Sequence, residues 1–246
     1  MSQPLHIGLL LCDTFEPILK QVGGLNYSAI FQKEFLAIDS NIRFTDFNAY
    51  KGELPNTVDQ CDVWLINGSP AGAYEDIDWV HQLSGFIEQL QTAKKPTFGI
   101  CFGHQLMAQA LGGKVERSNK GWGIGISHNS VVAAKQYMQP RAKGIDVMAF
   151  HQDQVVQLPE GSEVLASSDF CPNYMVQYNN HMLSIQGHPE FNTQIVEGVL
   201  ARESFDNRPA IRAQGMANSV GKPDTKLLFQ WVVNFYRQAI SHPKPL

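Results

Sequence analysis

One cysteine of this chain stands between two glycines, in the segment GICFGHQ. An apolar run typical of a strand precedes Cys101, and a run typical of a helix follows it. Gly99 and Gly103 would let so sharp a turn pass close to the neighbouring strand and helix. At the amino terminus of a helix, the dipole and the free N–H groups favour a thiolate over a thiol. The spacing is therefore typical of a nucleophilic cysteine, with the backbone amide of Phe102 placed where an oxyanion would form.

A buried cysteine in a glycine-containing turn would show the same pattern, so this interpretation also requires a base. His188 is the best candidate, because it follows an apolar run and begins the segment HPE. In extended chain, residues two apart project to the same side, so Glu190 can accept a hydrogen bond from the imidazole and orient it. His151 could also line the site, whereas His104 shares a helix with Cys101 and would rarely reach back to it. The other five histidines are expected at surface or satisfied core positions: His6, His81, His128, His181 and His242.

Three segments taken together, GICFGHQ, QGHPE and INGSPAG, resemble the class I glutamine amidotransferases of the triad family. The resemblance spans about residues 5–200. It implies that Cys101 is the nucleophile, that His188 is the base and that Glu190 orients the base. It also implies an enzyme, a cysteine hydrolase of the glutaminase type.

The same resemblance implies where the substrate is held. The backbone amides of Ser69 and Phe102 would form the oxyanion hole, and Gln105 would help to hold the amino-acid end of glutamine. Many relatives carry glycine where this chain has Ser69, so turning that amide inward would cost more strain if a positive φ is required. Backbone contacts to the substrate are expected from Phe150, His151 and Gln152.

The resemblance leads to one preferred function and two alternatives. In the preferred function, a Cys-His-Glu triad releases ammonia from glutamine through a γ-glutamyl thioester, as in GMP synthase-like glutaminase domains. A synthase partner would receive the ammonia, because the chain shows no nucleotide-binding loop that could activate an acceptor. The first alternative is a free-standing γ-glutamyl peptidase that acts on glutathione-like or other γ-glutamyl compounds by the same chemistry. The second is a binding module without catalysis.

Strand and helix patterns alternate through the first half of the chain. This alternation predicts right-handed βαβ units and a mainly parallel sheet with flanking helices, an α/β fold that the family resemblance makes flavodoxin-like. Residues that follow the strand ends are then expected to form the site. The predicted strands are 5–12, 42–47, 61–67 and 96–100, and the predicted helices are 25–38, 77–93 and about ten residues after Cys101.

The second half changes to short strands separated by turn residues, at 122–133, 144–150, 162–168, 173–178 and 181–187. These strands either extend the parallel sheet or form a small antiparallel subsheet beside it. Helices are predicted at about 192–204 and 224–240, with a loop over the polar stretch 206–224. We expect a single domain over 1–246, in which 206–246 is a carboxy-terminal loop and helix extension.

Composition and charge argue against several classes of function. The formal net charge is −4 and no basic run occurs, so a nucleic-acid partner is not expected. The amino-terminal apolar stretch is too short for a signal peptide or a membrane span, so we expect no membrane partner. The four cysteines are widely spaced, which argues against a disulfide framework or a zinc site and for a reducing, cytoplasmic setting. We expect neither a metal ion nor another cofactor.

Overall fold

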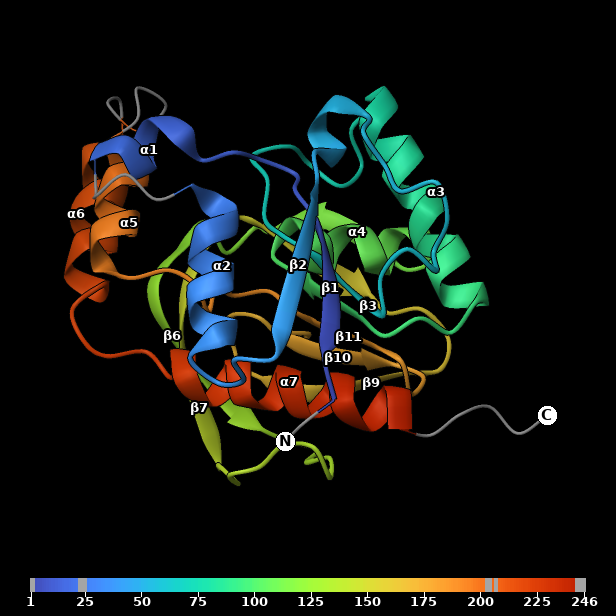
Figure 1. Ribbon diagram of the computed structural model, residues 1–246. Coiled ribbons are helices and arrows are strands. Elements are labelled where there is room, and N and C mark those ends of the chain that lie inside the picture. Colours follow the sequence, from blue (N-terminus) through green and yellow to red (C-terminus); the bar gives the residue numbers. More distant parts are fainter. Residues whose placement is uncertain (1–2, 22–25, 202–204, 206–207, 242–246) are drawn as a thin grey trace.

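A nine-stranded sheet forms the centre of the molecule (Figure 1). The computed structural model describes residues 3–21, 26–201, 205 and 208–241. A separate two-stranded sheet pairs β5 (Lys114–Arg117) with β8 (Asp153–Gln157). The strands of the large sheet, in their order across it, are β2 (Ile42–Phe47), β1 (Leu5–Leu10), β3 (Val63–Ile66), β4 (Thr97–Ile100), β11 (Met182–Ile185), β10 (Met175–Tyr178), β9 (Ser162–Ser167), β6 (Gly123–Val131) and β7 (Gly144–His151).

The first five strands in that order run parallel, and the other four join them through antiparallel pairs. The parallel half uses the strand–helix alternation of the first half of the chain, which confirms the predicted α/β fold with flanking helices. The predicted later strands extend the large sheet, which is one of the two arrangements expected of them. Strands β6, β7, β9, β10 and β11 extend the large sheet, and β5 and β8 form the small antiparallel sheet. The sequence patterns did not predict β5 or β8.

Helices cover both faces of the large sheet and bury two apolar cores. Alternation along β3 shows the division, because Val63 and Leu65 belong to one core while Trp64 and Ile66 belong to the other. In Figure 1, α2 and α7 lie in front of the sheet and α4 lies behind it. The first core includes residues of α1 (Glu16–Gln21), α2 (Tyr27–Leu36), α5 (Thr193–Leu200) and α7 (Thr225–Ser241), and the second includes residues of the 3-10 helix η1 (Ala49–Lys51), α3 (Asp78–Thr92) and α4 (Phe102–Ala110).

The polar stretch predicted as a loop, 206–224, contains the helix α6 (Pro209–Asn218), so that prediction was wrong. Pro209 occupies the start of the helix, where its fixed φ suits the first turn. Gly215 is the buried residue of α6, and a Cβ there would lie 2.7 Å from Ile124 Cγ2. Apart from Gly215, only Ile211 and Met216 of α6 pack against the first core, and both are only partly buried. So short an apolar face gives a weak helical pattern, which explains why the segment looked like a loop.

The predicted helices on either side of α6 are present as α5 and α7, which confirms them. Parts of the predicted segments, namely residue 25 and residues 202–204, 206–207 and 242–246, lie outside the described residues. No helix in the described part of the chain is long and apolar enough to cross a membrane.

Candidate active site

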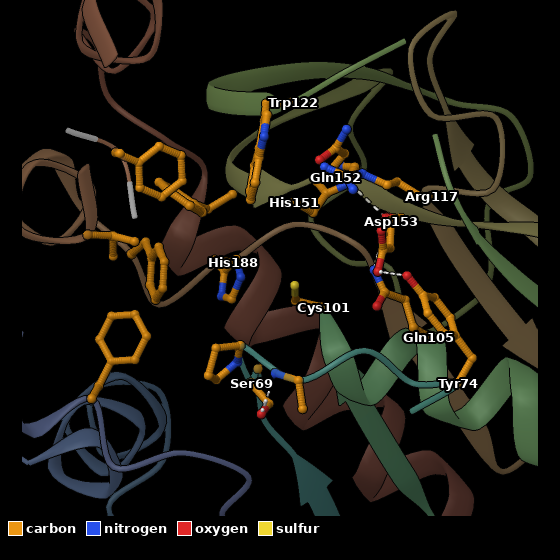
Figure 2. Close-up of a pocket in the computed structure, with 18 of the residues that line it drawn as sticks. Ser69, Tyr74, Cys101, Gln105, Arg117, Trp122, His151, Gln152, Asp153 and His188 are labelled. Carbon is orange, nitrogen blue, oxygen red and sulfur yellow. Dashed lines mark hydrogen bonds between the residues drawn. The ribbon is translucent and has the colours of Figure 1, made fainter. Parts of the chain in front are cut away.

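Three neighbouring strands end at one edge of the sheet and bring the predicted residues together. Strands β3, β4 and β11 are adjacent and parallel. The loop with Ser69 follows β3, Cys101 follows β4 directly, and His188 follows shortly after β11. Because the carboxyl ends of parallel strands meet at one edge of a sheet, these three residues line one cavity (Figure 2).

Cys101 occupies the strained turn that its flanking glycines predict. Its φ is 51° and its ψ is −101°, a conformation that is rare for a residue with a side chain. A Cβ on Gly103 would lie 2.4 Å from Ile66 O, and a Cβ on Gly99 would lie 2.7 Å from Gly103 O. Because backbone atoms cannot give way cheaply, both positions require glycine. The geometry confirms the role predicted for the two glycines and places Cys101 at the amino end of α4.

His188 lies beside Cys101 in the cavity (Figure 2). The Glu190 carboxylate holds the imidazole ring. His188 Nδ1 is 2.7 Å from Glu190 Oε1, and the hydroxyl of Tyr27 donates to the same oxygen at 2.8 Å. The Glu190 side chain is fully buried. Phe191 stacks on the imidazole with 4.0 Å between ring centroids, which fixes the plane of the ring. With Nδ1 held by Glu190, Nε2 is left for the thiol.

The charges around His188 stabilise its protonated form. Burial alone would lower the pKa of His188, but the Cys101 thiolate and the Glu190 carboxylate raise that pKa to about 10. The site therefore favours an imidazolium at His188 beside the sulfur of Cys101, the arrangement that activates a cysteine nucleophile. Burial instead raises the pKa of the Cys61 thiol to about 11 and that of the Cys171 thiol to about 12. Those thiols are poor nucleophiles at neutral pH.

The histidines at 151 and 104 have different surroundings. His151 lines the cavity with its Nδ1 3.1 Å from Asp153 O, and burial lowers its pKa to about 4. His104 Nδ1 is 2.7 Å from Ser184 Oγ, and burial lowers the pKa of this histidine to about 3. Both rings are neutral at pH 7. His151 is therefore available for substrate contact, while His188 is the lining histidine that has an orienting carboxylate.

The residues predicted for the oxyanion hole lie next to the nucleophile. Phe102 begins α4, so its amide is one of the free N–H groups of the first turn. Ser69 lines the cavity, and its Oγ accepts a hydrogen bond from Ala71 N at 3.2 Å. Ser69 does not have a positive φ, so the loop in this conformation makes no use of a glycine-like backbone. The oxyanion hole remains a prediction, as does the strain cost assigned to Ser69.

The cavity has a volume of about 450 Å³, and one end of it is polar (Figure 2). Gln105 Nε2 donates to Asp153 O at 2.9 Å and to Gln186 Oε1 at 3.1 Å. Gln186 Nε2 in turn lies 3.7 Å from Cys101 Sγ. Tyr74 donates its hydroxyl hydrogen to Asp153 Oδ2 at 3.0 Å. Tyr74, Asp153 and Gln186 were not predicted from the sequence, although Asp153 lies two residues after the predicted site histidine His151.

The rest of the cavity wall is mainly aromatic. Trp122 packs edge to face against Phe150 and Phe205, with ring centroids 5.7 and 5.2 Å away. Phe191 continues this wall beyond His188. Phe150 was predicted to contact the substrate through its backbone, and the structure adds its ring to the lining. Gln152, predicted for the same role, also lines the cavity.

Comparison with known families now adds to this geometry. The family model described as glutamine amidotransferase class-I matches residues 31–206. The chain belongs to this family. The match includes the nucleophile, the base and the orienting carboxylate proposed above, and it ends close to the start of α6.

Individual known proteins resemble the chain to different extents. Gamma-glutamyl peptidase 3 of Arabidopsis thaliana is 32% identical over 93% of this chain and 94% of its own length. A glutamine-hydrolyzing GMP synthase subunit of Sulfolobus acidocaldarius is 31% identical over 52% of this chain and 67% of its own length. A glutamine amidotransferase from Thermotoga maritima superposes with a TM-score of 0.74 at 17% identity, covering 96% of this chain and 98% of that one. At that identity the superposition shows a shared fold alone.

Proposed function

We propose that this protein is a γ-glutamyl peptidase, which hydrolyses the γ-glutamyl amide bond of small peptides. The observation that carries the proposal is the shape of the cavity. The cavity has a volume of about 450 Å³ and extends from the polar end to an aromatic wall. Ammonia as a leaving group is too small to need contacts with that wall. Cavities that hold small ligands have volumes of roughly 300–1,000 Å³ and bury most of the ligand surface. A γ-glutamyl peptide would occupy both parts, and the likeness to an Arabidopsis γ-glutamyl peptidase along 93% of the chain supports this function.

The polar end suits the free amino-acid end of the γ-glutamyl group. Asp153 offers a carboxylate to the α-ammonium group, and Tyr74 holds that carboxylate in place. Gln105 fixes the backbone carbonyl of Asp153, so it would act by positioning β8 as well as by touching the substrate. The backbone of 150–152 passes along the same cavity and can supply the contacts predicted from the sequence.

The triad would carry out the first half of the reaction on the γ-carbonyl. The Cys101 thiolate attacks the carbonyl carbon, and the amides of Phe102 and Ser69 stabilise the resulting oxyanion. The intermediate collapses as its C–N bond breaks, and the proton on His188 Nε2 passes to the departing amine. The products of this half are a γ-glutamyl thioester on Cys101 and a free peptide or amino acid.

The second half of the reaction uses the neutral His188 left by that proton transfer. His188 takes a proton from water, and the hydroxide attacks the thioester carbonyl. Collapse of the second intermediate releases glutamate and restores the thiolate beside an imidazolium. Glu190 keeps Nε2 directed at the reacting atoms through its 2.7 Å contact with Nδ1.

Glutamine hydrolysis is the second candidate, and the likeness to the Sulfolobus GMP synthase protein favours it. Glutamine would occupy the polar end of the cavity and leave the aromatic wall without a contact. In that case a synthase partner would receive the ammonia. The chemistry of the triad would be the same, so the two functions differ in the group that leaves.

One assay separates the two functions. Purified protein is incubated with glutamine or with γ-glutamyl-cysteinyl-glycine, and the release of glutamate, ammonia and cysteinyl-glycine is measured. We expect cysteinyl-glycine and glutamate from the peptide, with glutamine a poorer substrate. Turnover of glutamine alone would favour the second candidate. The control is Cys101→Ala, which should abolish either activity, and activity that survives this substitution would overturn the assignment of the nucleophile.

A further inference from the structure

A second cavity of about 590 Å³ adjoins the active site. The two cavities share one wall, and the remaining walls of the second cavity come mainly from the start of β6 and from α6. Among the described residues that line it, two arginines carry charge and there is no carboxylate. The chain as a whole has a net charge of −4, so this cationic lining is a local feature and attracts anions. The residues that it shares with the active-site cavity are Arg117, Trp122, Gln152 and Arg208.

Arg208 is placed for recognition at this shared wall. Its guanidinium lies 6.0 Å from the ring centroid of Trp122 and 5.7 Å from that of Phe205. Stacking of this kind orients a guanidinium while its N–H groups remain available to an anion. Arg208 directly precedes α6. No carboxylate of the described residues forms an ion pair with it. Among the described residues, the charge is therefore held in position without a carboxylate counter-ion.

Arg117 brings a second guanidinium to the same wall. It ends β5 and pairs with Asp153 in the register of the small sheet. It has no ion pair within the described part of the chain either. Figure 2 shows Arg117 beside Gln152, above the polar end of the active-site cavity. Arg117 adds positive charge between that polar end and the second cavity.

We propose that Arg208, with Arg117 in support, binds the terminal carboxylate of the leaving group of a γ-glutamyl peptide. The inference rests on the proposed peptidase function and names the part of the substrate that this wall recognises. With the γ-carbonyl at Cys101, the leaving peptide runs along Trp122 toward the shared wall. A guanidinium matches a carboxylate with two parallel hydrogen bonds, and glutamine has no carboxylate on its leaving side.

The test is a binding measurement that needs no turnover. Titration calorimetry on Cys101→Ala protein compares γ-glutamyl-cysteinyl-glycine with the same peptide ending in a carboxamide. The free acid should bind about tenfold more tightly or better, as a hydrogen-bonded ion pair implies. In the Cys101→Ala background, Arg208→Gln should bring the ratio of the two dissociation constants close to one, and Arg117→Gln should reduce it in part. Arg212→Gln is the matched control, because Arg212 is exposed in α6, four residues after Arg208, and lines neither cavity.

Each result decides between the proposal and its alternatives. Equal binding of the acid and the carboxamide would overturn the proposal, as would an unchanged ratio in folded Arg208→Gln protein. A parallel loss of affinity for both peptides would indicate a structural role for Arg208. If Arg208→Gln fails to fold, Arg208→Lys replaces it, and a lysine that retains the charge should retain part of the ratio. A different result would contradict the proposed function: protein with Cys101 intact that releases no cysteinyl-glycine from the peptide. The ratio of the two dissociation constants would still test the role of Arg208.

Discussion

An alanine at position 68 should displace the catalytic base while leaving the protein folded. A Cβ on Gly68 would lie 2.7 Å from His188 Cε1 and 3.5 Å from the hydroxyl oxygen of Tyr27. Non-bonded carbon atoms prefer a separation of about 3.5–4.0 Å, so the imidazole or the loop must move by about 1 Å. The imidazole has little room, because Phe191 stacks on it and Glu190 binds its Nδ1.

A displacement of about 1 Å in a reacting group can lower a rate by about 10²-fold. We therefore expect Gly68→Ala to reduce kcat by about that factor on whichever γ-glutamyl substrate the protein prefers. Overpacking of this size costs about 1–3 kcal/mol of unfolding free energy, so the melting temperature should fall by several degrees and the fold should persist. The assay is steady-state turnover together with thermal unfolding followed by circular dichroism.

Gly85→Ala is the matched control for the Gly68 experiment. Gly85 lies inside α3, and a Cβ there would meet nothing within 4 Å. Replacing a glycine by alanine inside a helix stabilises it by about 1 kcal/mol, so this variant should melt higher and turn over substrate at the normal rate. Folded Gly68→Ala protein with an unchanged kcat would refute the reasoning, because His188 could not then be the base in the geometry described.

Three further predictions address the charges and contacts of the triad. Brief treatment with iodoacetamide at neutral pH should label Cys101 first, and peptide mapping that found the other three cysteines labelled equally would contradict the assignment. Because the pKa of His188 is raised to about 10, kcat/KM should fall as the pH rises past that value. Glu190→Gln removes an anion that stabilises the imidazolium, so the alkaline fall should move to lower pH, and an unmoved profile would argue against the pair. Tyr27→Phe removes a hydrogen bond to Glu190 and should lower kcat by up to about tenfold. KM should change little, because Tyr27 does not line the cavity. An unchanged kcat would show that the Tyr27 hydroxyl has no positioning role.

The sequence was most informative where the chemistry depends on local pattern. The glycines at 99 and 103 predicted the strained turn of Cys101, and the structure shows the backbone contacts that require them. The spacing of His188 and Glu190 predicted a hydrogen bond that the structure places at 2.7 Å. Each of these features involves residues a few positions apart, so the sequence contained the whole relationship.

Relationships over long sequence distances were not predictable in this way. Tyr27 touches Glu190 from 163 positions away, and no local pattern singles it out from other tyrosines in amphipathic helices. Strand β5 is only four residues long and charged, so its pairing with β8 depends on tertiary contact. Helix α6 packs mainly through Gly215 and the partly buried Ile211 and Met216, so its apolar face is too short to stand out in the sequence. Because that helix was not predicted, the wall that includes Arg208 could not be predicted either.

Different elements carry the proposed triad and the groups proposed to select the substrate. Strands β3, β4 and β11 are parallel neighbours, and their ends carry the residues proposed as oxyanion loop, nucleophile and base. The groups that would select the substrate come from elsewhere: Trp122 begins the approach to β6, Asp153 begins β8, and Arg208 precedes α6. Because these groups lie outside the strands that carry the triad, the leaving-group wall can change without moving the reacting atoms. A change of leaving group within this fold should therefore require substitutions around β6, β8 and α6, and it should leave the pH dependence set by His188 and Glu190 unaltered.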